Sequence, residues 1–262
     1  MSAEVARLDL WARRRALLGY CAGMGLYTLV IVALYPQFKD STSLDNITKN
    51  APTLSALFGA IGSLTSPSGW LDANIYENFF PLVVLLLSIG YGASAIAGAN
   101  QEGTLCLVAT LPTARSRILV AKVGAMLAQG VALSLTVAVV IAAGRGFQLH
   151  LPLIHVGESS TAVFLLGADF GLLTLAIGAA TGNRGVALAV GSGTAAASYL
   201  VSSLAPVVAW IRPARFASLF YWAVGNDQLT RGVTWAEMVV LVLIGVIASV
   251  LAVLAFERLD LG

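Results

Sequence analysis

Charged residues are scarce in this 262-residue chain, at 11% of the sequence, whereas 58% of it is hydrophobic and the mean hydropathy is +0.86. Soluble domains carry about 25% charged residues, mostly on the water-facing surface. The 15 basic and 13 acidic residues nearly balance, so no excess of positive charge is present to bind a polyanion. The composition therefore argues against a soluble protein and against nucleic acid as a partner.

Residues that perform common enzymatic chemistry are equally few. The three lysines, Lys39, Lys49 and Lys122, follow no glycine, so the sequence lacks the P-loop with which an ATPase holds phosphates. The two histidines, His150 and His155, match no H-E-x-x-H motif, and the two cysteines form no C-x-x-C pair. We expect no metal site, no cofactor and no catalytic residue in this chain.

Long apolar runs are the main positive feature of the sequence. A helix of about 20 apolar residues crosses a hydrocarbon layer of about 30 Å. Asp169 is the one charged residue in the six runs of that length. The predicted fold class is therefore all-α, a polytopic membrane helical bundle of six transmembrane helices. The runs are 16–35, 79–99, 123–143, 161–181, 186–210 and 238–256.

The first 15 residues are expected to form an amphipathic helix at the membrane surface, with a frayed basic tail as the alternative. The apolar run that follows is longer than the core of a signal peptide and precedes no cleavage site, so we expect a retained first span within a transmembrane domain at 16–262. Nine Lys and Arg residues lie on the side of the N-terminus and six on the other side. The positive-inside rule then places both termini in the cytoplasm.

Two long segments fall on the predicted outer side, at 36–78 and 211–237. Residues 54–64 in the first are apolar but too short to cross the membrane. The second mixes aromatic residues with arginines, as segments at the membrane interface do. It is either an exposed loop or a re-entrant lid over the outer mouth of a transport path.

One sizeable loop, 100–122, lies on the predicted inner side. Leu105, Val108 and Leu111 recur at helical spacing before Pro112 ends the helix. An apolar face in the cytosol needs a partner or the bilayer surface to cover it. The loop either reconnects two spans or docks a partner.

This loop resembles the corresponding segment in the permease subunits of type-2 ATP-binding-cassette (ABC) exporters. Members of that family carry an E-x-G-T-L-like start, an apolar run, an L-P-x-x-R-x-x-I/L-like turn and a lysine at the head of the third span. Six spans, an amphipathic N-terminus and an outer Arg-Pro-aromatic stretch extend the resemblance, although only 101–122 is specific. The matching positions here are Glu102, Gly103, Thr104, Leu105, Leu111, Pro112, Arg115, Ile118 and Lys122.

The resemblance implies an exporter permease whose coupling helix, at about 101–117, docks on a separately encoded ABC ATPase. ATP and Mg²⁺ would be bound by that ATPase. Two permeases, identical or paralogous, would enclose a path for a hydrophobic small molecule or lipid cargo in a bacterial cytoplasmic membrane. The implied coupling residues are Glu102, Gly103, Thr104, Leu105, Val108, Leu111, Pro112, Arg115 and Arg117.

Asp169 is the ionisable residue inside a predicted span, where a charge costs at least about 2.5 kcal/mol. Gly167 and Gly171 flank it in a G-x-x-x-G pattern, which permits close helix packing. A packing role and a role in a substrate path both remain open. Two other functions also remain open for the chain: an ion-coupled secondary transporter with Asp169 as proton carrier, and a non-transporting membrane scaffold.

Overall fold

The structure is a computed structural model that describes residues 2–39, 65–103, 115–225 and 227–257. Regular structure within these ranges is helical throughout, with no strand. Six helical segments are long and apolar enough to cross a membrane, which confirms the predicted all-α polytopic bundle. They are Asp9–Phe38, Pro67–Gln101, Ser116–Phe147, Leu153–Thr181, Arg184–Leu204 and Trp235–Glu257.

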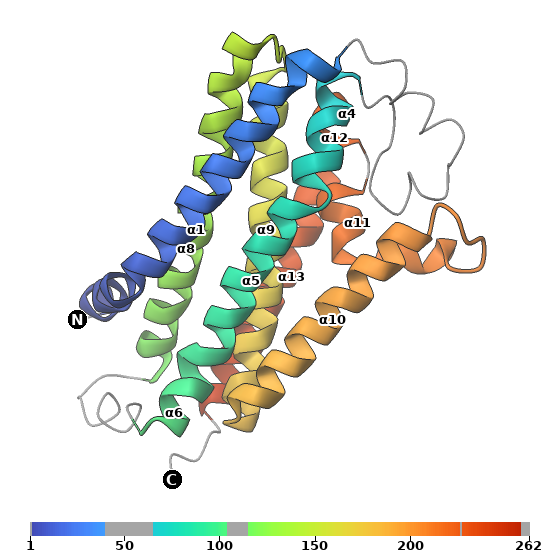
Figure 1. The fold of residues 1–262 in the computed structure, drawn as a ribbon. Coiled ribbons are helices and arrows are strands. Elements are labelled where there is room, and N and C mark those ends of the chain that lie inside the picture. Colours follow the sequence, from blue (N-terminus) through green and yellow to red (C-terminus); the bar gives the residue numbers. More distant parts are fainter. Residues whose placement is uncertain (1, 40–64, 104–114, 226, 258–262) are drawn as a thin grey trace.

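Successive long helices run in alternating directions, so that both termini lie at the same end of the bundle (Figure 1). We call this the terminal end, and the other the opposite end. The long helices are α1 (Ser2–Phe38), α5 (Phe79–Ala93), α8 (Arg115–Ala143), α9 (Leu153–Thr181), α10 (Arg184–Leu204) and α13 (Trp235–Glu257).

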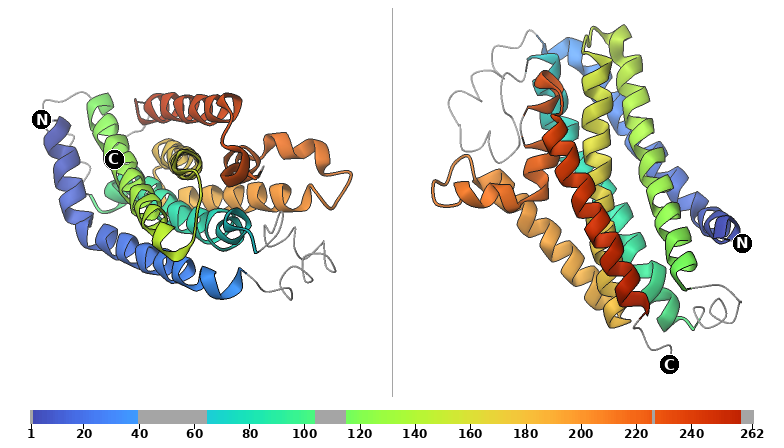
Figure 2. Two further views of the ribbon diagram at one scale, coloured as in Figure 1. Left: turned by 90° about the horizontal axis from the view of Figure 1, so that it is seen from above. Right: turned by 180° about the vertical axis from the view of Figure 1, so that it is seen from behind.

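The N-terminal residues and the first span form one helix, α1, whose N-terminal part is bent away from the rest (Figures 1 and 2). Its exposed face carries Arg7, Trp11, Arg14 and Leu18, three or four positions apart. The Arg14 guanidinium lies 4.4 Å from the centre of the Trp11 ring. This spacing puts basic and aromatic groups on one side of α1, away from the bundle.

Helical structure in the second span begins at Pro67, well before the apolar run, and so extends into the segment expected to be a loop. The Ser66 side chain caps α4 (Pro67–Leu71) by accepting a hydrogen bond from the Gly69 N–H. Proline suits the first helical position because its missing N–H has no partner there in any case. The π-helical η1 (Asp72–Tyr76) then leads to α5, which continues through the π-helical η2 (Ser94–Gly98) and α6 (Ala99–Gln101).

α10 ends at Leu204, short of the predicted 210, because Pro206 follows and cannot continue the helix. At the end of α8 the difference is in the other direction, because the 3-10 helix η3 (Gly144–Phe147) continues it beyond the predicted 143. Residues of the predicted outer segment form η4 (Arg212–Ala217), α11 (Leu219–Val224) and α12 (Gln228–Arg231). α11 packs against α9, α10 and α13, with Phe220 and Ala223 buried.

α9 is the most buried of the six spans and packs against α5, α8, α10 and α13 (Figure 2). Glycines permit the close contact with α5. A Cβ atom added at Gly92 would overlap the backbone carbonyl of Gly171, and one at Gly167 would overlap Val84. The predicted G-x-x-x-G pair therefore faces α5 and fixes that helix against the centre of the bundle.

Candidate functional site

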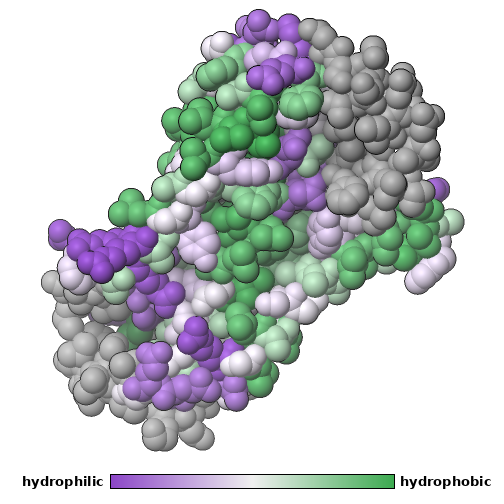
Figure 3. All heavy atoms as spheres, in the orientation of Figure 1, coloured by the Kyte–Doolittle hydropathy of each residue, from purple (hydrophilic) through white to green (hydrophobic). Residues whose placement is uncertain are grey.

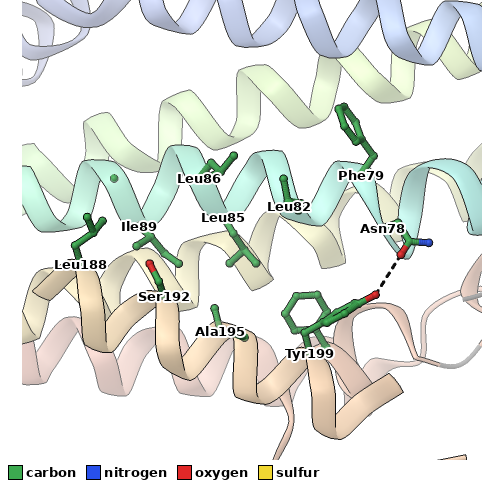
Figure 4. A pocket seen from close by; sticks show the side chains of 13 residues that line it. Asn78, Phe79, Leu82, Leu85, Leu86, Ile89, Leu188, Ser192, Ala195 and Tyr199 are labelled. Atoms are coloured by element: carbon green, nitrogen blue, oxygen red, sulfur yellow. Dashed lines mark hydrogen bonds between the residues drawn. The ribbon is translucent and has the colours of Figure 1, made fainter. Parts of the chain in front are cut away.

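An apolar groove of about 490 Å³ lies between α5 and α10, within the size range of small-molecule sites (Figure 4). Leu82 and Leu86 of α5 are 53% and 58% exposed, whereas Ile89 and Ala195 are 5% and 6% exposed. The groove thus has an open side and a buried base. Figures 1 and 2 show that α10 is inclined to the other long helices.

The chemistry of the groove is apolar with a few neutral polar groups. No charged side chain is among the described residues that line it, and the polar ones are Asn78, Ser192 and Tyr199. A charged ligand would lose its hydration there without gaining an ionic partner. In Figure 3, polar residues gather toward the ends of the visible face and apolar residues between them. The groove therefore suits an apolar molecule that carries one or two hydrogen-bonding groups.

A hydrogen bond joins the start of α5 to α10 at the part of the groove nearest the opposite end. The Tyr199 hydroxyl donates to Asn78 Oδ1 at 3.2 Å (Figure 4), and Asn78 Nδ2 donates to the Ala73 carbonyl at 2.9 Å. The Tyr199 ring packs edge-on against Phe220, with ring centres 5.3 Å apart. These contacts set the separation of the two helices toward the opposite end.

Most of the predicted coupling helix lies outside the described residues. That part comprises Thr104, Leu105, Val108, Leu111 and Pro112. Glu102 and Gly103 are exposed just after α6, and Gly103 has a φ of 70°, which a glycine adopts without strain. Arg115 begins α8, and Arg117 is exposed on it. The structure thus brings the two flanks of the segment to the terminal end (Figure 1).

Asp169 lies in α9 and is 1% exposed. A Cβ atom added at Gly245 of α13 would lie 2.8 Å from its Oδ1. Neither carboxylate oxygen has a hydrogen-bond partner among the described residues. Asp169 is absent from the groove lining, while its neighbours Gly167 and Gly171 face α5. Asp169 therefore lies apart from this groove, and the packing role and the role in a substrate path both stay predictions.

Acidic residues also gather toward the opposite end. Asp72 and Glu77 are buried, and each has one oxygen without a partner in the described part of the chain. Burial raises the pKa of the Asp227 carboxyl above its usual range, while the Arg231 charge acts in the opposite direction. In the described ranges, no three His, Cys, Asp or Glu residues are grouped as a metal ion requires.

The sequence did not single out the groove residues. A leucine that faces a groove and one that faces lipid have the same composition and spacing. The one feature of the sequence that could have indicated the groove is its polar residues, which are Asn78 at the start of α5 and Ser192 and Tyr199 on α10. Those residues become informative only when the two helices are known to lie side by side.

The chain is similar to a known family of membrane proteins over nearly its whole length. The model of the family described as "ABC-2 family transporter protein" matches residues 3–261 of the chain. A search of curated proteins found none that matches this chain.

Proposed function

Because this chain belongs to the ABC-2 family of transporter proteins, we propose that it is the permease of an ATP-driven exporter for apolar cargo. The observation that carries the proposal is the groove between α5 and α10, which is large enough for a small molecule and lined without charge. Hydrophobic drugs, antibiotics and lipid-like molecules have the matching chemistry.

An external ATPase supplies the energy in this proposal, because the sequence has no P-loop. The ATPase docks on the coupling helix at 101–117. Support comes from the flanks, since α6, which the exposed Glu102 follows, and the start of α8, which carries the exposed Arg117, are both at the terminal end (Figure 1). Arg7, Arg15 and Arg184 are exposed toward the same end, and the positive-inside rule places such residues in the cytoplasm.

A second permease copy, or a paralogue, completes the cargo path. α10 and α1 are the least buried spans, and the exposed surface of α10 includes small and polar residues. Ser192, Gly193 and Thr194 are all exposed there. Helix interfaces within membranes are rich in such residues, because they permit close approach and hydrogen bonding between helices. The groove would then face the partner permease.

ATP binding closes the two ATPases in this mechanism, and their movement is passed to the coupling helices. The two permease bundles rock between inward-facing and outward-facing forms, so the groove opens first to one side and then to the other. Cargo leaves when its apolar contacts with α5 and α10 are lost. The permease makes and breaks no covalent bond, and ATP and Mg²⁺ are bound by the partner.

The test is co-purification in mild detergent with the ATPase encoded beside this chain. We expect the wild-type chain to elute with the ATPase, and Leu105→Asp and Leu111→Asp to lose it, because a charge would interrupt the apolar docking face. The matched control, Leu105→Ile, keeps the face apolar and should bind. Equal binding by all four proteins would show that the ATPase does not dock there.

A further inference from the structure

A compact polar cluster joins three helices near the terminal end. The Asp9 carboxylate of α1 accepts a hydrogen bond from Lys122 Nζ of α8 at 3.0 Å and another from the Tyr91 hydroxyl of α5. The Asp9 and Lys122 side chains are only 15% and 17% exposed. One carboxylate therefore bridges α1, α5 and α8.

Arg13, one helical turn after Asp9, adds a second contact between α1 and α5. Its guanidinium donates to Ser94 Oγ at 2.7 Å and lies 4.5 Å from the centre of the Tyr91 ring. Asp9 and Arg13 thus contact the last turn of α5 and the start of η2 from one face of α1. The opposite face of this part of α1 carries the exposed Arg7 and Trp11.

The cluster joins α1 to the two helical segments that precede and follow the stretch expected to dock the ATPase. α5 runs on through η2 and α6 to Gln101, and α8 begins at Arg115. Lys122 is seven residues into α8, which is about 10 Å along the helix. Tyr91 and Lys122 therefore lie on the two helices that flank residues 104–114.

Apolar packing around Asp9, Tyr91 and Lys122 restricts the movement of these polar side chains. Tyr91 and Leu119 are buried in a hydrophobic cluster that also includes Phe256 of α13, and Leu10 of α1 packs against that cluster. Side chains held this way lose little further freedom when they pair, and surrounding apolar groups shield the ion pair from water. Ion pairs that are exposed to water, by contrast, contribute almost nothing to the stability of the fold.

We propose that Asp9 is a positioning residue that locks the start of α1 to both helices flanking the coupling segment, so that ATPase movement reaches α5, and with it the groove, through one rigid unit. The inference rests on the proposed function. It assigns the start of α1 an active part in coupling, in addition to the membrane-surface location predicted for residues 1–15.

The experiment follows the groove while ATP is bound. In a chain without Cys21 and Cys106, a single cysteine is placed by Leu86→Cys, and the complex with the ATPase is trapped with ATP and vanadate. The rate at which a membrane-permeant maleimide labels the cysteine is measured with and without trapping. We expect trapping to change this rate in the otherwise wild-type complex.

Asp9→Asn is expected to reduce the ATP-dependent change in labelling rate by roughly fivefold, as loss of one interhelical polar pair can. ATPase binding should be retained. Lys122→Gln should act in the same way, and the exchange Asp9→Lys with Lys122→Asp should recover at least part of the response. Arg7→Gln, an exposed change two residues before Asp9, should behave as the wild type does.

The outcomes separate the two proposals. A full response in both Asp9→Asn and Lys122→Gln overturns the role of Asp9 alone. Equal loss of thermal stability and response in the single variants, with no recovery on exchange, shows a merely structural ion pair and also overturns it. A wild-type complex that does not form, or whose groove does not respond to ATP, overturns the proposed function and this inference with it.

Discussion

Filling the groove between α5 and α10 should weaken cargo binding and reduce transport without unfolding the protein. Ala196 lines the groove from α10 and is exposed, so Ala196→Trp places an indole ring where cargo would lie. Forcing extra bulk into an occupied site costs about 1–3 kcal/mol. At about 1.4 kcal/mol per factor of ten, apparent cargo affinity should fall by roughly fivefold to 150-fold.

The neighbouring alanine provides a matched control. Ala197 is also exposed on α10 but does not line the groove, because one residue turns a helix by about 100°. The assay is stimulation of the partner ATPase by apolar compounds, read as the concentration giving half-maximal stimulation. Ala196→Trp should raise that concentration and Ala197→Trp should not. Equal values for the two variants, with both as stable as the wild type, would refute the groove as the cargo site.

Three further substitutions test the packing of α5 on α9 and the acidic residues Asp169 and Asp227. Gly92→Ala should lower the unfolding temperature in detergent, because its Cβ would meet the Gly171 carbonyl, whereas Gly124→Ala, with open space around it, should not; equal temperatures would contradict the α5–α9 contact. Asp169→Asn should preserve transport and stability, since its carboxylate has no hydrogen-bond partner in the described residues; loss of transport, with ATP depletion having no effect, would instead favour a proton carrier. Asp227→Asn should stabilise the protein at neutral pH, because the raised pKa means that the folded state disfavours the charged form. That gain should disappear as the pH falls below about 4, where the carboxyl is protonated in the unfolded state too; a gain independent of pH in thermal melts would contradict this.

The bundle was predictable because apolar length alone identifies a membrane span. Nothing in a lipid environment competes with the helix for backbone hydrogen bonds, so a run such as 238–256 has one stable structure. The ends were harder to predict. Ser66 and Pro67 form an N-terminal helix signal, but the acidic Asp72 and Glu77 that follow resemble a loop until their burial is known.

The polar contacts of Asp9, the groove and the surroundings of Asp169 could not be predicted from the sequence, because they depend on contacts between residues far apart in the chain. Asp9 meets Tyr91 and Lys122 across 82 and 113 positions of the chain, and no local pattern connects them. The groove depends on how α10 inclines to α5, which packing at Phe220 and the Asn78–Tyr199 hydrogen bond control. Asp169 could be identified as a buried acid, but only the structure shows that it faces Gly245 rather than the groove.

The central claim is that this chain moves apolar cargo when a separate ATPase hydrolyses ATP. The most direct measurement reconstitutes the permease and the neighbouring ATPase into sealed vesicles and follows a panel of fluorescent apolar compounds and labelled lipids. The account predicts movement that requires ATP, fails with an ATPase unable to hydrolyse it, and is reduced by Ala196→Trp but not by Ala197→Trp. Movement that persists without ATP and follows a proton gradient would contradict it.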